Sequence, residues 1–303
     1  MAKKGNFLER LKAGEILLSD GAWGTELQKL GLEAGGNPEE LNVVKPELPR
    51  QVAYSYCQAG ADMILTNTFN GTHFRQKHYD KIEKVAEFNQ AGAALSKDAA
   101  KEFGVFVVGS MGPTGEFVEP LGSVTEQEMY DAYKVQADAL KAGGADAVVV
   151  ETIFALEEMR IAIRAAKDAG LFVMATMTFD PGAFGYKTMM GVSVEDAAKG
   201  MDEAGADVIG TNCGNGIDNM VQIVKEMRPF TKKPILVHSN AGLPKLVKGQ
   251  IIYGETPELM AAKVKDLVAA GANIVGGCCG TSPDHIRAFR KEVDAINAAR
   301  KGA

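Results

Sequence analysis

The sequence predicts an α/β fold, a (β/α)8 barrel of eight parallel strands that alternate with helices. The first observation behind this prediction is a pattern that occurs eight times: a short apolar run, a loop of Gly, Thr, Asn or Ser, and a helical segment. The apolar runs are continuous rather than alternating, as expected for strands covered on both faces. They lie at 16–19, 63–66, 105–109, 147–150, 172–176, 208–211, 235–238 and 273–276.

The second observation is a turn that recurs before every second strand. Its four copies are Ala59-Gly60-Ala61-Asp62, Gly143-Gly144-Ala145-Asp146, Ala204-Gly205-Ala206-Asp207 and Ala270-Gly271-Ala272-Asn273. Each copy ends a helix with glycine and leads into a strand. Uniform helix-to-strand turns beside variable strand-to-helix loops are expected of a barrel whose functional residues lie at one rim.

The helical segments follow the strands in order. We expect helices near 47–59, 81–102, 125–142, 155–169, 194–204, 216–228, 256–270 and 283–299. Thr125, Thr256-Pro257 and Ser282-Pro283 are typical helix starts. An open doubly wound sheet is less favoured, because the turn after the first strand, 20–25, lacks the third glycine of a nucleotide-binding loop. No change in composition marks a second domain, so we expect residues 1–303 to form one barrel domain.

Composition and charge narrow the functional classes. The net charge of −6 gives no reason to expect binding to nucleic acid or to a membrane surface. No secretory signal follows the basic start of the chain, and no apolar run is long enough to span a bilayer. These features predict a cytoplasmic protein. In a reducing compartment, its four cysteines are expected to be metal-binding, catalytic or buried rather than disulfide-bonded.

Three of these cysteines are expected at the ends of strands. Cys278 and Cys279 lie between glycines after the eighth strand, and Cys213 follows the sixth. Adjacent cysteines do not easily bridge to each other, but both can face one soft metal. Packing or a redox pair would explain the pair alone, whereas the addition of Cys213 predicts a zinc site with an open fourth position. Cys57 is expected to be a core residue of the first main helix.

Two carboxylates are expected at the same rim. Asp20 follows the first strand and Glu151 follows the fourth. Asp20 could instead form an Asx turn, and Glu151 could cap the next helix. A three-thiolate zinc suits deprotonation of a further thiol, because coordination removes its proton. The carboxylates would then hold an amino group and the backbone of 21–25 a carboxylate, a set that describes a thiol amino acid.

Six motifs together resemble the homocysteine S-methyltransferase family, whose members include the N-terminal barrel of cobalamin-dependent methionine synthase and betaine–homocysteine methyltransferase. The motifs are Asp20-Gly21-Ala22-Trp23-Gly24-Thr25, Thr66-Asn67-Thr68-Phe69, Gly112-Pro113-Thr114-Gly115, Glu151-Thr152, Asn212-Cys213 and Gly276-Gly277-Cys278-Cys279-Gly280-Thr281. The segment 115–120 is closer to the methionine synthase branch. Trp23 is a departure, because the motif more usually has Met there.

The resemblance implies specific roles. Cys213, Cys278 and Cys279 would bind one Zn²⁺ per chain. Asp20 and Glu151 would hold the homocysteine amine, with Gly21, Ala22, Thr68 and Asn240 as further substrate contacts. Asn240 could also approach the open zinc position, or only satisfy loop backbone. His238 is expected to be a core histidine or to support the site indirectly.

The methyl donor is the open question at this stage. The resemblance implies a methylcobalamin, carried by a separate corrinoid protein because the chain has no Asp-x-His-x-x-Gly cobalamin motif. S-methylmethionine or a betaine would be small-molecule alternatives, and the sequence could also be a piece of a longer chain. Two further alternatives are a zinc barrel that only binds a thiol substrate for a partner, or whose zinc is structural, and a phosphate-binding barrel enzyme.

Overall fold

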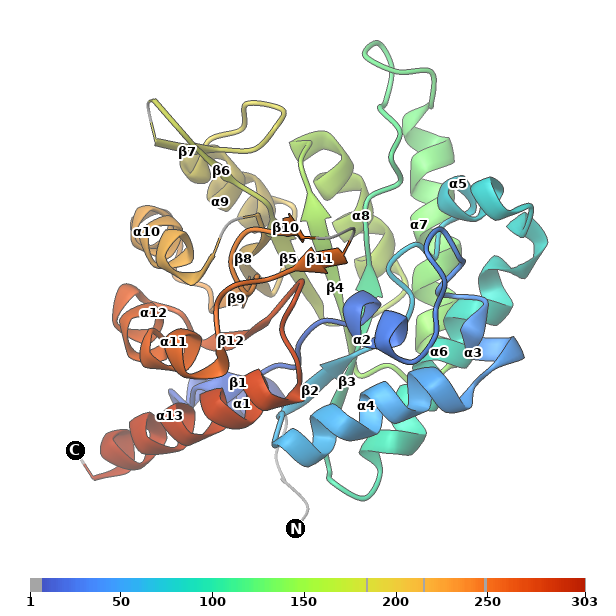
Figure 1. The fold of residues 1–303 in the computed structure, drawn as a ribbon. Helices are drawn as coiled ribbons and strands as arrows, with labels where there is room; N and C mark the ends of the chain where they lie inside the picture. Colours follow the sequence, from blue (N-terminus) through green and yellow to red (C-terminus); the bar gives the residue numbers. More distant parts are fainter. Residues whose placement is uncertain (1–6, 184, 215, 248–249, 303) are drawn as a thin grey trace.

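The computed structural model describes residues 7–302, apart from 184, 215 and 248–249, and shows eight parallel strands in a nearly closed barrel (Figure 1). The barrel strands are β1 (Leu17–Leu18), β2 (Met63–Leu65), β3 (Phe106–Met111), β4 (Ala147–Ile153), β5 (Val173–Met177), β8 (Val208–Cys213), β9 (Ile235–Ser239) and β12 (Ile274–Gly277). Their order in the sheet is β1-β12-β9-β8-β5-β4-β3-β2. The predicted fold class and all eight predicted strands are confirmed.

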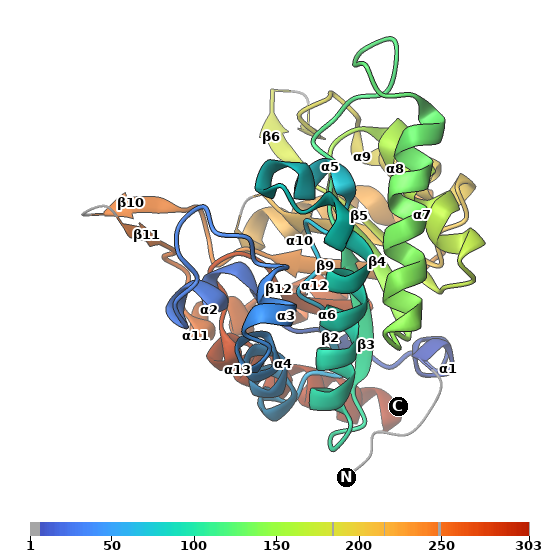
Figure 2. The ribbon, with the colours of Figure 1, turned by 90° about the vertical axis from the view of Figure 1, so that its right-hand side faces the viewer.

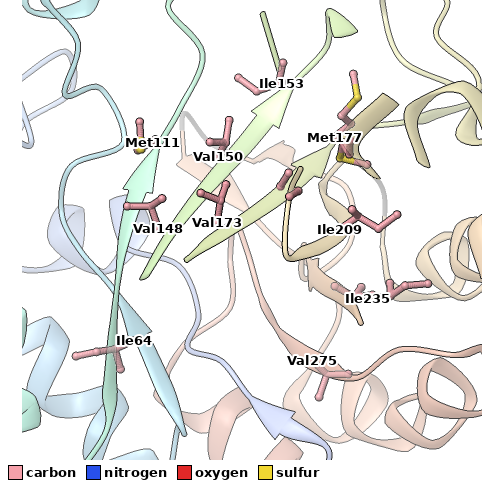
Figure 3. Close-up of a cluster of buried hydrophobic side chains, with 14 of the residues drawn as sticks. Ile64, Met111, Val148, Val150, Ile153, Val173, Met177, Ile209, Ile235 and Val275 are labelled. Atoms are coloured by element: carbon pink, nitrogen blue, oxygen red, sulfur yellow. The ribbon is translucent and has the colours of Figure 1, made fainter. Parts of the chain in front are cut away.

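Alternate residues of each strand pack on opposite sides of the barrel wall. Met63 and Val149 belong to an inner cluster that consists mainly of strand residues. Their neighbours Ile64 and Val148 belong to the large outer cluster beneath the helices, part of which Figure 3 shows. Because both faces of each strand are buried, the strands are apolar without a break in the sequence.

Helices cover the outside of the barrel and mostly match the predicted segments. They are α4 (Glu47–Ala59), α6 (Val85–Ala100), α7 (Glu126–Ala142), α8 (Leu156–Asp168), α9 (Val194–Glu203), α10 (Ile217–Met227), α11 (Pro257–Ala262), α12 (Val264–Ala270) and α13 (Pro283–Lys301). The single helix expected at 256–270 is two, because the Lys263 N–H bonds to Met260 O at 3.0 Å and breaks the α-helical pattern. Within the described chain, no helix is both long and apolar enough to cross a membrane.

A short helix that the sequence did not predict closes the lower end of the barrel. In α1 (Phe7–Lys12), the Phe7 ring lies edge-on to Phe106 and Phe172, with centroids 5.3 and 5.5 Å away. Phe7 and Leu11 are part of the inner cluster. α1 therefore covers the packed core at this end, and the carboxyl ends of the strands form the opposite, open rim.

The loops at that open rim contain further elements that were expected only as loops or not at all. They are α2 (Gly24–Lys29), α3 (Leu41–Val44), α5 (His73–Gln76) and the hairpins β6 (Asp180–Gly182)–β7 (Gly185–Lys187) and β10 (Lys245–Val247)–β11 (Gln250–Ile252). Figure 2 shows the β10–β11 hairpin standing out from the barrel. Short 3-10 turns lie at Lys77–Tyr79, Ile82–Lys84 and Arg228–Phe230.

The four repeated turns join the strands in pairs at the rim where the strands begin. In each turn the last residue exchanges two hydrogen bonds with one residue of the preceding strand, through its own N–H and its side-chain oxygen. The pairs are Asp62 with Leu18, Asp146 with Val107, Asp207 with Val173 and Asn273 with Ile235, at 2.7–3.0 Å. The Asp62 pair lies at the joint between β1 and β2, which are the two ends of the sheet order.

Candidate metal and substrate site

The three predicted cysteine ligands converge at the open rim. Cys213 is the last residue of β8, and Cys278 and Cys279 follow β12 directly. Their sulfur atoms all lie within 4.8 Å of one another, so the cluster could hold a metal ion. Cys57, the fourth cysteine, is 3% exposed in α4, as predicted for a core residue.

The backbone around the cysteine pair accounts for its glycines. A side chain at Gly277 would come within 2.2 Å of Thr281 Oγ1, because Thr281 folds back to donate to Cys278 O at 2.7 Å. Gly280 has a φ of +80°, and the ring of Tyr253 lies where its Cβ would be. The sharp turn that presents both thiols therefore requires residues without side chains.

The three thiols share their protons unequally. Hydrogen bonds with Cys278 and Cys279 lower the pKa of Cys213, whereas hydrogen bonds with Cys213 and Cys279, followed by burial, raise the pKa of Cys278. These contacts therefore favour the thiolate form at Cys213 and the thiol form at Cys278 and Cys279. Such a set binds a divalent cation by exchanging those protons for the metal.

Asn240 and Tyr253 lie against this cluster. Asn240 Nδ2 lies 3.8 Å from Cys213 Sγ and donates to Gly214 O at 2.8 Å, while its Oδ1 is buried and has no hydrogen-bond partner among the residues that the structure describes. The Tyr253 hydroxyl donates to Cys279; burial, followed by the nearby Cys279 sulfur, raises its pKa. Asn240 was predicted from the resemblance, but Tyr253 was not, because its segment has no motif of its own.

Glu151 lies inside the barrel mouth at the end of β4. Its side chain is 5% exposed, accepts from Ser110 Oγ at 2.6 Å and lies 3.3 Å from Asn212 Nδ2. Burial raises the pKa of Glu151 to about 7, opposed by the Ser110 hydrogen bond and reinforced by the negative charge of Asp20. A nearby cation would favour the ionised form of this buried carboxylate.

Asp20 lies two residues after the end of β1 and is fully buried. Its Oδ2 accepts from Leu65 N at 2.7 Å and from Trp23 Nε1 at 2.9 Å, and its Oδ1 from Ser19 Oγ at 3.3 Å. Burial raises the pKa of Asp20 to about 7, although these donors lower it. Two carboxylates that repel each other without a cation thus share the mouth of the barrel.

The remaining residues of the predicted substrate site differ in the space around them and in whether their hydrogen-bonding groups are already engaged. Gly21 has no room for a side chain, since a Cβ would lie 2.7 Å from Thr281 Oγ1, and the Ala22 N–H donates to that same oxygen at 3.1 Å. The Thr68 hydroxyl donates to Ser110 O at 2.8 Å. Thr25 Oγ1, by contrast, is buried and has no hydrogen-bond partner in the described part of the chain.

Asn212 is a buried residue whose role the sequence did not reveal. Its Oδ1 accepts from Thr152 N and from Thr176 Oγ1, both at 2.8 Å, and its Nδ2 donates to Thr152 Oγ1 at 2.7 Å. Thr152 has a φ of +61° and Cys213 a φ of +62°. A β-branched residue in this region is strained by roughly 1–3 kcal/mol and needs support from its surroundings.

His238 lies beneath the site in β9. It is 1% exposed, its Nε2 has no hydrogen-bond partner within the described ranges, and burial lowers its pKa to about 4. The imidazole is therefore neutral at physiological pH and makes no ion pair with the carboxylates. This agrees with the prediction of a core or supporting histidine.

Comparison with known proteins gives a consistent result. A sequence model of the homocysteine S-methyltransferase family matches residues 17–293. Methionine synthase of Mycobacterium leprae is 33% identical over 310 residues, which cover 96% of this chain and 25% of that protein. Methionine synthase of Mycobacterium tuberculosis is 33% identical over 292 residues, covering 90% and 24%. The chain thus spans about a quarter of the length of these relatives.

Solved structures show the same fold. The metallated homocysteine methyltransferase MmuM from Escherichia coli aligns with a TM-score of 0.79 at 22% identity, over 93% of this chain and 98% of that one. The carboxyl transferase domain of Rhizobium etli pyruvate carboxylase aligns with a TM-score of 0.55 at 16% identity, over 98% and 52%. From the family match and the methionine synthase relatives, we conclude that this chain belongs to the homocysteine S-methyltransferase family.

Proposed function

We propose that the chain is a zinc-dependent S-methyltransferase that converts homocysteine to methionine, with a methylcorrinoid as the methyl donor. The observation that carries this proposal is the meeting of three cysteine sulfurs with two buried carboxylates at one barrel mouth. Sulfur ligands suit zinc, and paired carboxylates suit an ammonium group. Homocysteine carries the thiol and the amine that these groups would recognise.

The cysteine cluster fits zinc in number and kind of ligand. Three thiolates leave a fourth tetrahedral position open, which is typical of catalytic zinc sites. The unpartnered Oδ1 of Asn240 lies in the residue whose amide already contacts Cys213, so it could approach that position before substrate binds. When bound, the zinc would supply deprotonation of the substrate thiol, whose pKa is ~8.5 in free cysteine.

Asp20 and Glu151 are the proposed partners of the substrate amine. Each has a pKa raised to about 7 by burial, and the negative charge of Asp20 raises the pKa of Glu151 further. An ammonium group between them would neutralise this repulsion and keep both ionised. The Ser110 hydroxyl would hold Glu151 in place during binding.

The loop after Asp20 is the proposed partner of the substrate carboxylate. The hydroxyl of Thr25 is a buried donor of this loop that no group of the described residues engages. Because the Ala22 N–H is already bonded to Thr281, we assign the carboxylate to the far half of the loop rather than to Ala22. Gly21 and Ala22 then act by close packing.

Methyl transfer would join the donor's carbon to the substrate sulfur. The sulfur uses its electron pair to form the new carbon–sulfur bond, and the electron pair of the broken bond stays with the donor. Since no side chain needs to give or take a proton in this step, the protein's part is to position the thiolate and exclude water.

Exposed apolar side chains on the rim favour a large donor over a small molecule. Phe117, Leu121, Met189 and Leu246 are 44–77% exposed on three different strand-to-helix loops around the mouth. Where such side chains form a continuous surface, they are expected to mark a docking site for another protein. The methionine synthase relatives, which are about four times as long as this chain, are consistent with a corrinoid-carrying partner.

Metal content and thiol binding test the first half of the proposal. The purified chain should contain about one zinc per molecule, and homocysteine should release protons and perturb the zinc–sulfur X-ray absorption spectrum. A metal-replete protein whose spectrum is unchanged by homocysteine would refute it.

A comparison of donors tests the second half. Methyl transfer to homocysteine is measured with methylcobalamin, S-methylmethionine and glycine betaine side by side, with and without zinc. We expect zinc-dependent methionine formation from methylcobalamin. Turnover with a sulfonium or betaine alone would show a small-molecule donor, and binding without turnover would indicate a thiol-delivering barrel.

A further inference from the structure

The end of β4 departs from regular strand geometry at the point where Glu151 enters the barrel mouth. The register between β4 and β5 shifts between Val150 and Ile153, and Thr152 in this shift has a φ of +61°. Bulges of this kind re-aim a side chain next to an active site. The direction of Glu151 therefore depends on a strained residue that follows it.

The Asn212 side chain is the group that holds this strained residue. It bonds to both the N–H and the hydroxyl of Thr152, at 2.8 and 2.7 Å. Its remaining capacity goes to Thr176 Oγ1 at 2.8 Å and to Glu151 Oε2 at 3.3 Å. The amide is fully buried, and each of its hydrogen-bonding groups is used.

Asn212 also precedes the metal-ligand candidate Cys213, which is itself left-handed with a φ of +62°. The Asn212 carbonyl accepts from Thr178 Oγ1 at 2.9 Å, so main chain and side chain are both fixed. One residue thereby connects the end of β4, which carries a carboxylate, with the end of β8, which carries a thiol.

We propose that Asn212 is a positioning residue that clamps Thr152 in its left-handed conformation and so aims Glu151 at the substrate amine. The clamp does not touch the substrate itself. Its role in recognition rests on the proposed function, because it requires that Glu151 receives an amine. The effect of Asn212 on the conformation of Thr152 does not depend on substrate and can be measured without ligand.

The ligand test compares homocysteine with 4-mercaptobutyrate, which keeps the thiol and carboxylate but lacks the amine. Dissociation constants are measured by calorimetry on the zinc-loaded chain and on N212A, with zinc content checked for each. We expect N212A to lose about tenfold or more of the preference for homocysteine, the scale of one charged hydrogen bond. Affinity for 4-mercaptobutyrate should change little.

A matched control distinguishes positioning from general loss of stability. Asn297 is likewise buried and bonds the N–H and the carbonyl of Ile16, each at 2.8 Å, at the lower end of the barrel. N297A should lower the melting temperature but keep the preference for homocysteine. Equal loss of both ligands in N212A, or the same loss of preference in N297A, would overturn the proposal.

The strain test uses the fact that glycine adopts positive φ without support. In thermal unfolding, N212A should lower the melting temperature by less in the T152G background than in the wild-type background, with a difference of about 2 °C or more. If N212A and T152G lower the melting temperature additively, Asn212 does not clamp Thr152, even if the protein binds homocysteine. A wild-type protein without preference for homocysteine, but with this coupling, would instead refute the role of Glu151 in the proposed function.

Discussion

The indole Nε1 of Trp23 donates a 2.9 Å hydrogen bond to Oδ2 of Asp20, inside the loop that follows β1. The family motif more usually has Met at this position, which offers no such donor. The departure at Trp23 therefore adds a polar contact with a proposed substrate ligand. The bond favours the ionised form of Asp20 and lowers its pKa against the effect of burial.

Replacing Trp23 by Phe should therefore weaken homocysteine binding in a pH-dependent way. Without the donor, the pKa of Asp20 rises further above about 7, and less of the carboxylate is ionised near neutral pH. We expect a several-fold weaker dissociation constant at pH 7 that approaches the wild-type value near pH 9. A deficit that is the same at both pH values would contradict this explanation.

Replacing Cys278 by Ala should remove metal without unfolding the barrel. Its thiol lies at the rim, whereas the strands are held by two apolar clusters below it. Metal analysis should give well under one zinc per chain, and the melting temperature of the metal-free protein should change by less than about 2 °C. C57A is the control, because Cys57 is a buried core residue that should affect stability but not zinc content.

Replacing Tyr253 by Phe should weaken zinc binding by removing a hydrogen bond to Cys279. The hydroxyl stabilises the thiolate form, so its loss should reduce zinc affinity several-fold, measured by competition with a chelator. Y130F is a matched control, since the Tyr130 hydroxyl bonds to Asp168 on the outside of the barrel at 2.8 Å. Equal zinc affinities for Y253F and wild type would show that this contact is unimportant.

Glu39 predicts a pH dependence of stability. It is 1% exposed, accepts from Asn70 N at 2.7 Å, and burial raises its pKa from 4.5 to about 7. Because the folded state holds the proton more tightly, the contribution of Glu39 to stability is full below pH 4.5 and is lost as pH rises through 7. The shift corresponds to a loss on the order of 3 kcal/mol.

E39Q should lack this contribution, because an amide does not ionise. In urea unfolding, the stability of E39Q relative to wild type should rise between pH 5 and pH 8. A constant difference across this range would show that Glu39 does not titrate as expected.

Much of the barrel was predictable because its strands and turns follow local rules. Continuous apolar runs and glycine-ended helices identified all eight strands, and Thr125 does cap α7 through Glu128. The break at Lys263 was not predictable, since nothing in its neighbours interrupts the helical pattern. The aspartates of the repeated turns were visible, but their bonds to the preceding strand depend on how two strands lie side by side.

The candidate site was predictable where its reactive side chains lie at the ends of strands. Cys213, Cys278 and Cys279 converge because parallel strands bring their carboxyl ends to one rim. Asn212 was hidden because its function comes from a strained neighbour 60 positions earlier in the chain. Thr68 stays a predicted substrate contact; its hydroxyl donates to Ser110 O, a contact that no local pattern predicts.

Asp20 has a second task at the joint between β1 and β2. Its carboxylate bonds to Leu65 N, and Asp62 bonds to Leu18 below it, so side chains help to join these strands. The carboxylate proposed to bind an amine thus also contributes a hydrogen bond that joins the end of β1 to β2. The Leu65 amide hydrogen consequently serves as a built-in reporter: its exchange with deuterated water should follow occupancy of the site next to it.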